Sequence, residues 1–275
     1  MTTLKRFLDF YINSSIHVAL AVCSLAIITC FNFNVEVDIN LICFLFFSTI
    51  TGYNFVKYFG LAKFHHRSLA NWLKYIQLFS LVAFFALIYF TFKLNVNVIF
   101  ILCGLGLITF LYAIPFLPKK YFLDKSKNLR TVSGLKIHVI AFVWSITTVI
   151  IPIVNQDYVI DFDVVITTIQ RFLFVLIVML PFEIRDMKYD SLKLGTIPQR
   201  IGIKQTKLIG IVLIVLMLLL EFLKDEFYYD QLMILVIIMF VTGILLWYST
   251  IKQKAYYSSF WVESIPVFWL LLCLL

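Results

Sequence analysis

Long apolar runs and short polar segments alternate along the whole chain. A helix that crosses the hydrocarbon core of a bilayer needs about 20 mostly apolar residues, and in lipid only helices and closed barrels satisfy every backbone hydrogen bond. The runs are too long for barrel strands and lack their alternation, so the pattern predicts an all-α, polytopic membrane bundle. About nine transmembrane helices are expected, near residues 14–33, 39–62, 70–92, 96–117, 134–154, 161–184, 205–223, 229–250 and 257–275.

The composition agrees with a membrane protein. Of the 275 residues, 62% are hydrophobic and 14% are charged, whereas soluble domains are about 45–50% apolar and about 25% charged. We therefore expect residues 1–275 to form a single transmembrane domain. The five cysteines all lie in apolar runs without paired spacing, which favours small membrane-compatible side chains over a disulfide or zinc framework.

Lys and Arg are distributed unevenly over the loops. With nine alternating spans, 20 of the 23 cations fall on one side, Lys93 and Lys224 on the other, and Arg171 inside a span. In membrane proteins the cytoplasmic loops carry the excess of Lys and Arg. The pattern predicts a cytoplasmic N-terminus and an outer C-terminus, in a bacterial inner membrane. The net charge of +8 is then a signal of topology, and no binding to nucleic acid is expected.

The segment PFEIRDMKYDSLKLGTIPQRIG (181–202) gathers charges between the sixth and seventh apolar runs. On a helix, Glu183, Asp186 and Asp190 share one face. Proteins usually hold Mg²⁺ through one or two carboxylates plus substrate phosphates, and interleaved cations such as Arg185 suit phosphate oxygens. Two interpretations remain open at this point: a metal–phosphate site at the rim of a cavity, or a charge cluster that anchors the sixth span.

The string RDMKYDSLKLGTIPQRIG resembles the second aspartate-rich motif of the UbiA superfamily of membrane prenyltransferases. In that family a D-x-x-x-D pair precedes a Gly-Thr-x-Pro turn and a further Gly that leads into the next helix. Here these residues are Asp186, Asp190, Gly195, Thr196, Pro198 and Gly202. The stretch YAIPFLPKK (112–120) is similar to the segment after the family's fourth helix. Nine helices and a cytoplasmic active site also match the family.

The resemblance implies an enzyme that transfers an isoprenyl group from a prenyl diphosphate to a lipophilic acceptor, aromatic or a quinone precursor, at the cytoplasmic membrane face. It implies that Asp186 and Asp190 are catalytic and hold Mg²⁺ with the diphosphate, whose charge the metal stabilises as it leaves. The expected substrate-binding residues are Asn54, Lys57, Tyr112, Lys119, Lys136 and Arg185. Membrane lipid is a further expected partner, and the residues specify no oligomeric state.

The family's first motif, N-x-x-x-D-x-x-x-D, is incomplete in this chain. Asn54 matches its Asn, but Tyr58 and Ala62 occupy the two aspartate positions, and no Asp or Glu occurs between residues 39 and 123. Three alternatives follow. The enzyme uses one metal and replaces the charge of the other with cations such as Lys57. Alternatively, the fold is kept without transfer, to bind a lipid or a partner. In the third alternative, the protein is a transporter.

The transporter interpretation rests on Arg171 and Glu263, the ionisable groups placed deepest in apolar runs. Charged residues inside a membrane mark functional sites by default. We expect instead that Arg171 extends to the interface or pairs with an acid of the loop before its span. Glu263 lies among Tyr and Ser near the start of the last run, and we expect it at the interface.

Overall fold

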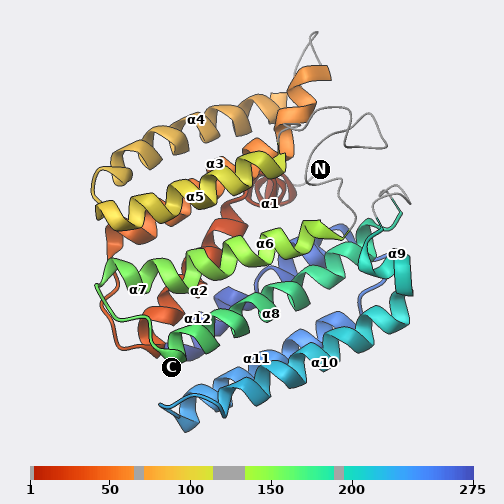
Figure 1. Cartoon of the computed structure of the whole chain (residues 1–275). Helices are drawn as coiled ribbons and strands as arrows, with labels where there is room; N and C mark the ends of the chain where they lie inside the picture. The colour runs from red at the N-terminus through yellow and green to blue at the C-terminus, as the bar shows by residue number, and fades with distance from the viewer. Residues whose placement is uncertain (1–2, 65–70, 114–133, 189–194) are drawn as a thin grey trace, which may run out of the picture.

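The computed structural model is a bundle of helices that run side by side (Figure 1). It describes residues 3–64, 71–113, 134–188 and 195–275, and these contain no strand. The elements are α1 (Thr3–Asn13), α2 (Ile16–Asn32), α3 (Ile39–Phe64), α4 (Asn71–Thr91), α5 (Val96–Ala113), α6 (Leu135–Ser145), the π-helical turn η3 (Ile146–Ile150), α7 (Ile151–Asn155), α8 (Phe162–Asp186), α9 (Ile197–Ile201), α10 (Ile203–Glu221), α11 (Tyr229–Trp247), the π-helical turn η5 (Tyr257–Val262) and α12 (Ile265–Cys273).

Each of the nine predicted apolar runs coincides with a helix or a helical run in the described residues. By length and composition, six of these can cross a membrane alone: α3, α4, the α6–η3–α7 run, α8, α10 and α11. α1 and α2 qualify together as a bent pair, while α5 and the η5–α12 run are apolar but shorter. The chain is an integral, multi-pass membrane protein with an all-helical fold, as predicted. The helix α1 is an addition that the apolar pattern did not predict.

α8 lies at the centre of the bundle. In its apolar window 72% of the residues are buried, against 17% in α4, and it packs against α6, α10 and α11. Its buried side chains, such as Phe174 and Ile177, form the main core with residues of α2, α6, α10, α11 and α12. Figure 1 shows α3, α4 and α5 on one side of this core and α10 and α11 on the other. α8 is therefore the helix against which the others are positioned.

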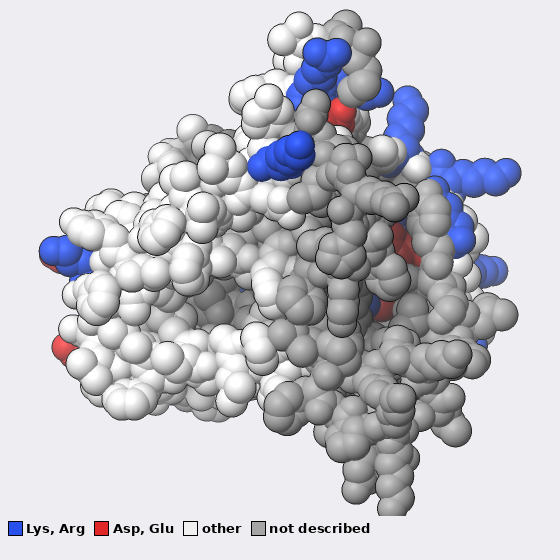
Figure 2. Space-filling model, turned by 90° about the horizontal axis from the view of Figure 1, so that it is seen from above, with Lys and Arg blue, Asp and Glu red and all other residues white. Residues whose placement is uncertain are grey.

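The two ends of the bundle differ in charge. Most Lys and Arg side chains visible in Figure 2 lie toward the end that is at the right in Figure 1, where α6 begins and α8 ends; we call it the cation-rich end. At the other end, acidic side chains support the loops. Asp161 caps α8 by accepting from the Val164 N–H at 2.9 Å, and Asp163 accepts from the backbone N–H groups of Asp225 and Glu226. Acidic side chains at this end therefore fix the connections between helices.

Both π-helical turns are followed by a proline, Pro152 after η3 and Pro266 after η5. A proline donates no backbone N–H, so the carbonyl one turn earlier loses its helical partner. Thr148 supplies that carbonyl for Pro152, and it accepts from the Thr29 hydroxyl at 2.7 Å. The irregular turn thus binds α2 to the α6–η3–α7 run.

α1 and α2 meet at a bend of 56°, where Ser15 has a left-handed backbone with φ 65°. Side chains of α3 hold this bend in place. Asn54 accepts from the Ser15 hydroxyl at 2.8 Å and donates to the Ser14 carbonyl at 3.0 Å. One turn further on, the Tyr58 hydroxyl donates to the Asn13 carbonyl at 2.8 Å. The bend is therefore a specified feature, fixed by polar contacts with a neighbouring span.

Arg171 is buried inside the bundle with 2% of its surface exposed, so the expectation that it reaches the interface is wrong. Its guanidinium donates to the Leu25 carbonyl at 2.9 Å and to the hydroxyls of Thr148 and Thr29 at 3.4 Å. It also lies 5.5 Å from the centre of the Trp269 ring. Carbonyl, hydroxyl and aromatic groups take the place of the acidic partner that we expected.

Candidate active site

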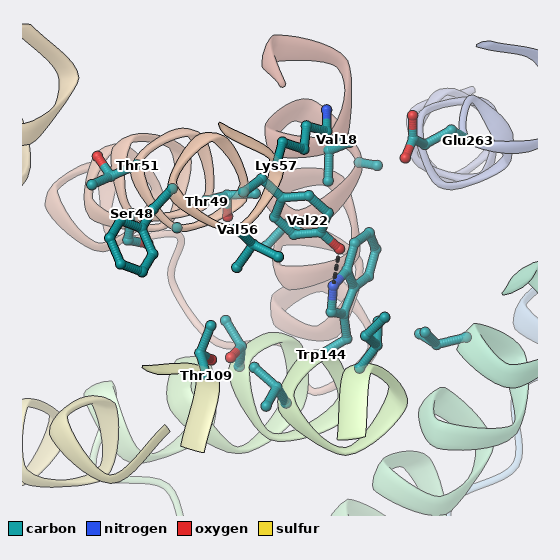
Figure 3. A pocket seen from close by; sticks show the side chains of 18 of the residues that line it. Val18, Val22, Ser48, Thr49, Thr51, Val56, Lys57, Thr109, Trp144 and Glu263 are labelled. Atoms are coloured by element: carbon teal, nitrogen blue, oxygen red, sulfur yellow. Dashed lines mark hydrogen bonds between the residues drawn. The ribbon is translucent and has the colours of Figure 1, made fainter. Parts of the chain in front are cut away.

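A cavity of about 1330 Å³ lies among α1 to α6, η3, α8 and the η5–α12 run. Along α3 its lining extends from Phe44 to Lys57, which is about 20 Å at the 1.5 Å rise of an α-helix. Most of the lining side chains are apolar or aromatic. A hydrogen bond from Trp144 Nε1 to the Tyr53 hydroxyl, 2.9 Å long, joins two sides of its wall (Figure 3). Such a long, apolar space suits an extended hydrocarbon chain.

The charged residues of the lining lie toward the cation-rich end, which we call the mouth of the cavity. They number three of each sign: Asp9, Lys57, Lys136, Arg185, Asp186 and Glu263. They come from α1, α3, α6, α8 and the segment after η5. The tertiary fold, and not one sequence motif, assembles this group.

Asp186, the last residue of α8, meets two cations. Arg185 Nε lies 2.8 Å from its Oδ1, and Lys136 Nζ, at the start of α6, lies 3.8 Å from its Oδ2. The guanidinium of Arg185 is also 5.1 Å from the centre of the Phe182 ring. The structure thus brings together three of the residues that the sequence proposes for the site, at the boundary between charged groups and the apolar lining.

Two further predicted residues, Lys57 and Tyr112, line the same cavity. The Lys57 ammonium donates to the Ser15 hydroxyl oxygen at 2.8 Å, so the bend between α1 and α2 positions it. Tyr112 lies near the end of α5 and is buried. Asp190 and Lys119 fall outside the residues that the structure describes.

Asn54 and Glu183 do not line the cavity. The amide of Asn54 is engaged at the α1–α2 bend and also donates to Ser80 Oγ at 2.8 Å, so the structure does not bring it to the diphosphate position that we expected. Glu183 is 1% exposed and accepts from the Ile197 N–H, at the start of α9, at 3.2 Å. It holds the returning chain, and the expectation that it shares an acidic rim with Asp186 is wrong.

The structure adds two acids to the mouth that the sequence did not assign to a site. Glu263 lines the cavity on the side opposite Lys57 (Figure 3), where we expected a group at the membrane interface. Its position inside an apolar run was the available signal. Asp9 of α1 accepts a hydrogen bond from the Tyr256 hydroxyl. No pattern pointed to Asp9, because it precedes the first apolar run.

Of the two residues that the resemblance assigns to Mg²⁺, the described part of the chain includes Asp186. Asp186 presents a carboxylate to the cavity, and Mg²⁺ needs only one or two protein carboxylates when phosphates and water complete its shell. α3 adds no carboxylate. Tyr58 stands where the family's first motif has an aspartate, and its hydroxyl donates a hydrogen bond to the Asn13 carbonyl. Within the described ranges, no three His, Cys, Asp or Glu side chains cluster as a metal site made only of protein groups would require.

These features define a multi-pass helical membrane protein with an apolar cavity inside the bundle and a charged mouth. Comparison with models of protein families finds no match to the sequence, and comparison with curated proteins finds none. Among solved structures, one chain aligns over 98% of this chain and 97% of its own length, with a TM-score of 0.58 and 18% identity. The work that describes it concerns digeranylgeranylglyceryl phosphate synthase in membranes. The two chains share a fold, and the predicted all-α, polytopic membrane bundle is confirmed.

Proposed function

We propose that this protein transfers an isoprenyl group from a prenyl diphosphate to a lipophilic acceptor. The observation that carries the proposal is the cavity, which is apolar along its length and ends at Asp186, Lys136 and Arg185. An isoprenyl diphosphate has the same division between a long apolar chain and a compact anion. The shared fold with a structure described for digeranylgeranylglyceryl phosphate synthase supports a donor of this class.

In the proposed reaction, Lys136 and Arg185 bind the diphosphate. A guanidinium forms paired bonds to phosphate oxygens, and an ammonium adds a point charge. When the bond between the prenyl carbon and the diphosphate oxygen breaks, the electron pair leaves with the diphosphate, and these fixed cations stabilise the charge that develops. The aromatic faces of Tyr53 and Phe182, which line the cavity, stabilise the carbon that becomes positive.

Asp186, with Asp190, would hold Mg²⁺ beside the diphosphate. The ion, when bound, acts as a Lewis acid that neutralises charge on the leaving group. Lys57 then supplies positive charge at the wall where the family motif would place a second set of carboxylates. The acceptor is proposed to be an aromatic or quinone-precursor molecule that reaches the mouth from the membrane.

A second candidate is a protein that binds a prenyl diphosphate or another lipid without transferring it. Tyr58 favours this alternative, because it stands where a metal-binding carboxylate is expected and is used for packing. Its hydroxyl is bound to Asn13, and its ring lies 6.2 Å from that of Trp72. The two candidates differ in whether diphosphate is released.

The test uses the purified full-length chain in lipid nanodiscs, with Mg²⁺, radiolabelled geranylgeranyl diphosphate and an extract of bacterial membrane lipids. We expect the label to enter a lipid product and diphosphate to be released at the same rate. Asp186→Asn should lower that rate about 100-fold or more, because the carboxylate that would hold Mg²⁺ beside the leaving diphosphate is lost.

Asp225→Asn is the matched control, because Asp225 is an exposed aspartate at the opposite end of the bundle. It should transfer at the wild-type rate. Undiminished transfer by Asp186→Asn would contradict the proposed site. Tight binding of the labelled donor by the wild type, without release of diphosphate, would select the second candidate.

A further inference from the structure

The carboxylate of Glu263 is exposed to the cavity and has no hydrogen-bond or ion-pair partner within the described part of the chain. Figure 3 shows it projecting into the cavity from the wall that faces Lys57. A carboxylate in an apolar lining is costly unless a donor compensates it. The charges of Lys57 and Arg185 act on it from across the cavity, and a molecule bound in this space can donate to it directly.

The backbone around Glu263 is firmly held. His17 Nε2 donates to the Phe260 carbonyl at 3.0 Å, and the two rings stack with centroids 5.0 Å apart. The Ser264 hydroxyl lies 3.2 Å from the same nitrogen, and the Tyr11 hydroxyl lies 2.8 Å from Nδ1. Glu263 therefore stands between two anchored residues, directly after the π-helical turn η5. Single π-helical turns within α-helices are frequent at functional sites.

Two hydrogen-bond donors lie on the other side of the same space. The Lys57 ammonium uses one N–H for Ser15 and retains two more. The Tyr53 hydroxyl oxygen accepts from Trp144, so its own proton remains available to a bound molecule. A ligand that both donates to Glu263 and accepts from Lys57 or Tyr53 fits this arrangement. A neutral hydroxyl does both, whereas a carboxylate offers no proton to Glu263.

We propose that Glu263 is a catalytic residue on the acceptor side, and that it takes the proton from the hydroxyl of a phenol or alcohol acceptor. This inference rests on the proposed prenyl transfer. The acceptor oxygen forms a bond to the prenyl carbon as the bond from that carbon to the diphosphate oxygen breaks. The electron pair leaves with the diphosphate, and the proton of the hydroxyl moves to the Glu263 carboxylate. Lys57 and Tyr53 position the acceptor oxygen.

The first experiment measures binding and does not require turnover. The full-length chain in nanodiscs is titrated with 4-decylphenol and with 4-decylanisole, its methyl ether, which lacks the hydroxyl proton; empty nanodiscs give the baseline. The phenol should bind the wild type about tenfold more tightly than the ether, because a hydrogen bond to a carboxylate is lost with the proton. Glu263→Gln should remove most of this difference, and Glu226→Gln, at an exposed glutamate of the opposite end, should retain it.

The second experiment measures prenylation of 4-decylphenol by geranylgeranyl diphosphate as a function of pH. The wild-type rate should fall on the acidic side as Glu263 becomes protonated, and Glu263→Gln should show a rate at least tenfold lower without that acidic limb. Binding of geranylgeranyl diphosphate should be unchanged in the variant. A purely structural role would not remove the limb while sparing donor binding.

The outcomes for the two proposals are separate. Equal binding of phenol and ether by the wild type, or full phenol preference in Glu263→Gln, would overturn the assignment of Glu263. Failure of the wild type to bind geranylgeranyl diphosphate would instead overturn the proposed function, whatever the phenol titration shows.

Discussion

Arg171 carries its charge in the centre of the bundle without an acidic partner among the described residues. Moving an ion out of water costs several kcal/mol, and good hydrogen bonds repay only part of that cost. The contacts of Arg171 are one strong bond to Leu25, two long contacts to hydroxyls, and the face of Trp269. Arg171 does not line the main cavity. Its role in the proposed enzyme is therefore structural.

We expect Arg171→Met to leave the thermal unfolding midpoint of the detergent-solubilised protein unchanged or higher. Replacing a buried ion with an apolar side chain of similar length is often neutral or stabilising by about 1–4 kcal/mol. Arg171→Lys should lower the midpoint, because an ammonium keeps the charge but loses the planar stacking and the fork of donors.

Prenyl transfer by Arg171→Met should match the wild type. A transporter that uses Arg171 to bind or move its substrate would instead lose activity in this variant. A midpoint for Arg171→Met below that of Arg171→Lys would contradict the structural argument.

At the scale of single residues, the sequence predicted the Asp186 position through its spacing to Gly195 and Pro198. The structure places Asn54 against the backbone and side chains at a left-handed Ser15, and no local sequence pattern predicts that conformation. Glu263 was visible as a charge in an apolar run, but its orientation depends on the η5 turn and on His17, a contact across almost the whole chain.

At the scale of elements, α3 is both a wall of the cavity and the support of the α1–α2 bend. In the second half of α3, Asn54, Lys57 and Tyr58 form hydrogen bonds with residues 13–15. Because Lys57 also lines the cavity, a change in the bend would displace a charged group of the mouth.

Asn54→Ala should therefore lower the free energy of unfolding by about 1–3 kcal/mol, since buried partners at the bend are left unsatisfied. Limited proteolysis should cut α1 faster in this variant. Asn97→Ala is the matched control at an exposed position of α5 and should change the unfolding midpoint little. Equal midpoints for the two variants would show that Asn54 does not hold the bend.

The elements themselves followed closely from the apolar pattern, because in lipid every long apolar segment must close its own hydrogen bonds as a helix. The apolar pattern did not predict α1, because its apolar residues are interrupted by Lys5, Arg6 and Asp9 and occupy only one side of the helix. The pattern did not predict the π turns either. A proline removes one helical hydrogen bond, but its presence does not require the preceding turn to be π-helical.

At the scale of the whole molecule, the difference in charge between the two ends leads to a prediction of orientation. Loops rich in Lys and Arg stay in the cytoplasm, so we propose that the mouth of the cavity faces the cytoplasm. In a chain with its native cysteines replaced, Glu36→Cys should react with a membrane-impermeant thiol reagent added to intact cells. Lys252→Cys should react only after the membrane is permeabilised. The opposite pattern of labelling would place the mouth outside.

The position of Arg171 along the chain bears on how the protein enters the membrane. Synthesis begins at the N-terminus, so the segments with Leu25, Thr29 and Thr148 are made before α8. When the guanidinium arrives, the carbonyl and hydroxyl groups that receive it are already present, and only Trp269 follows later. The groups that pair with this charge are therefore synthesised before it, and pairing with them keeps it from lipid, where it would be most costly. The order of the helices in the chain thus places most partners of the charge ahead of it.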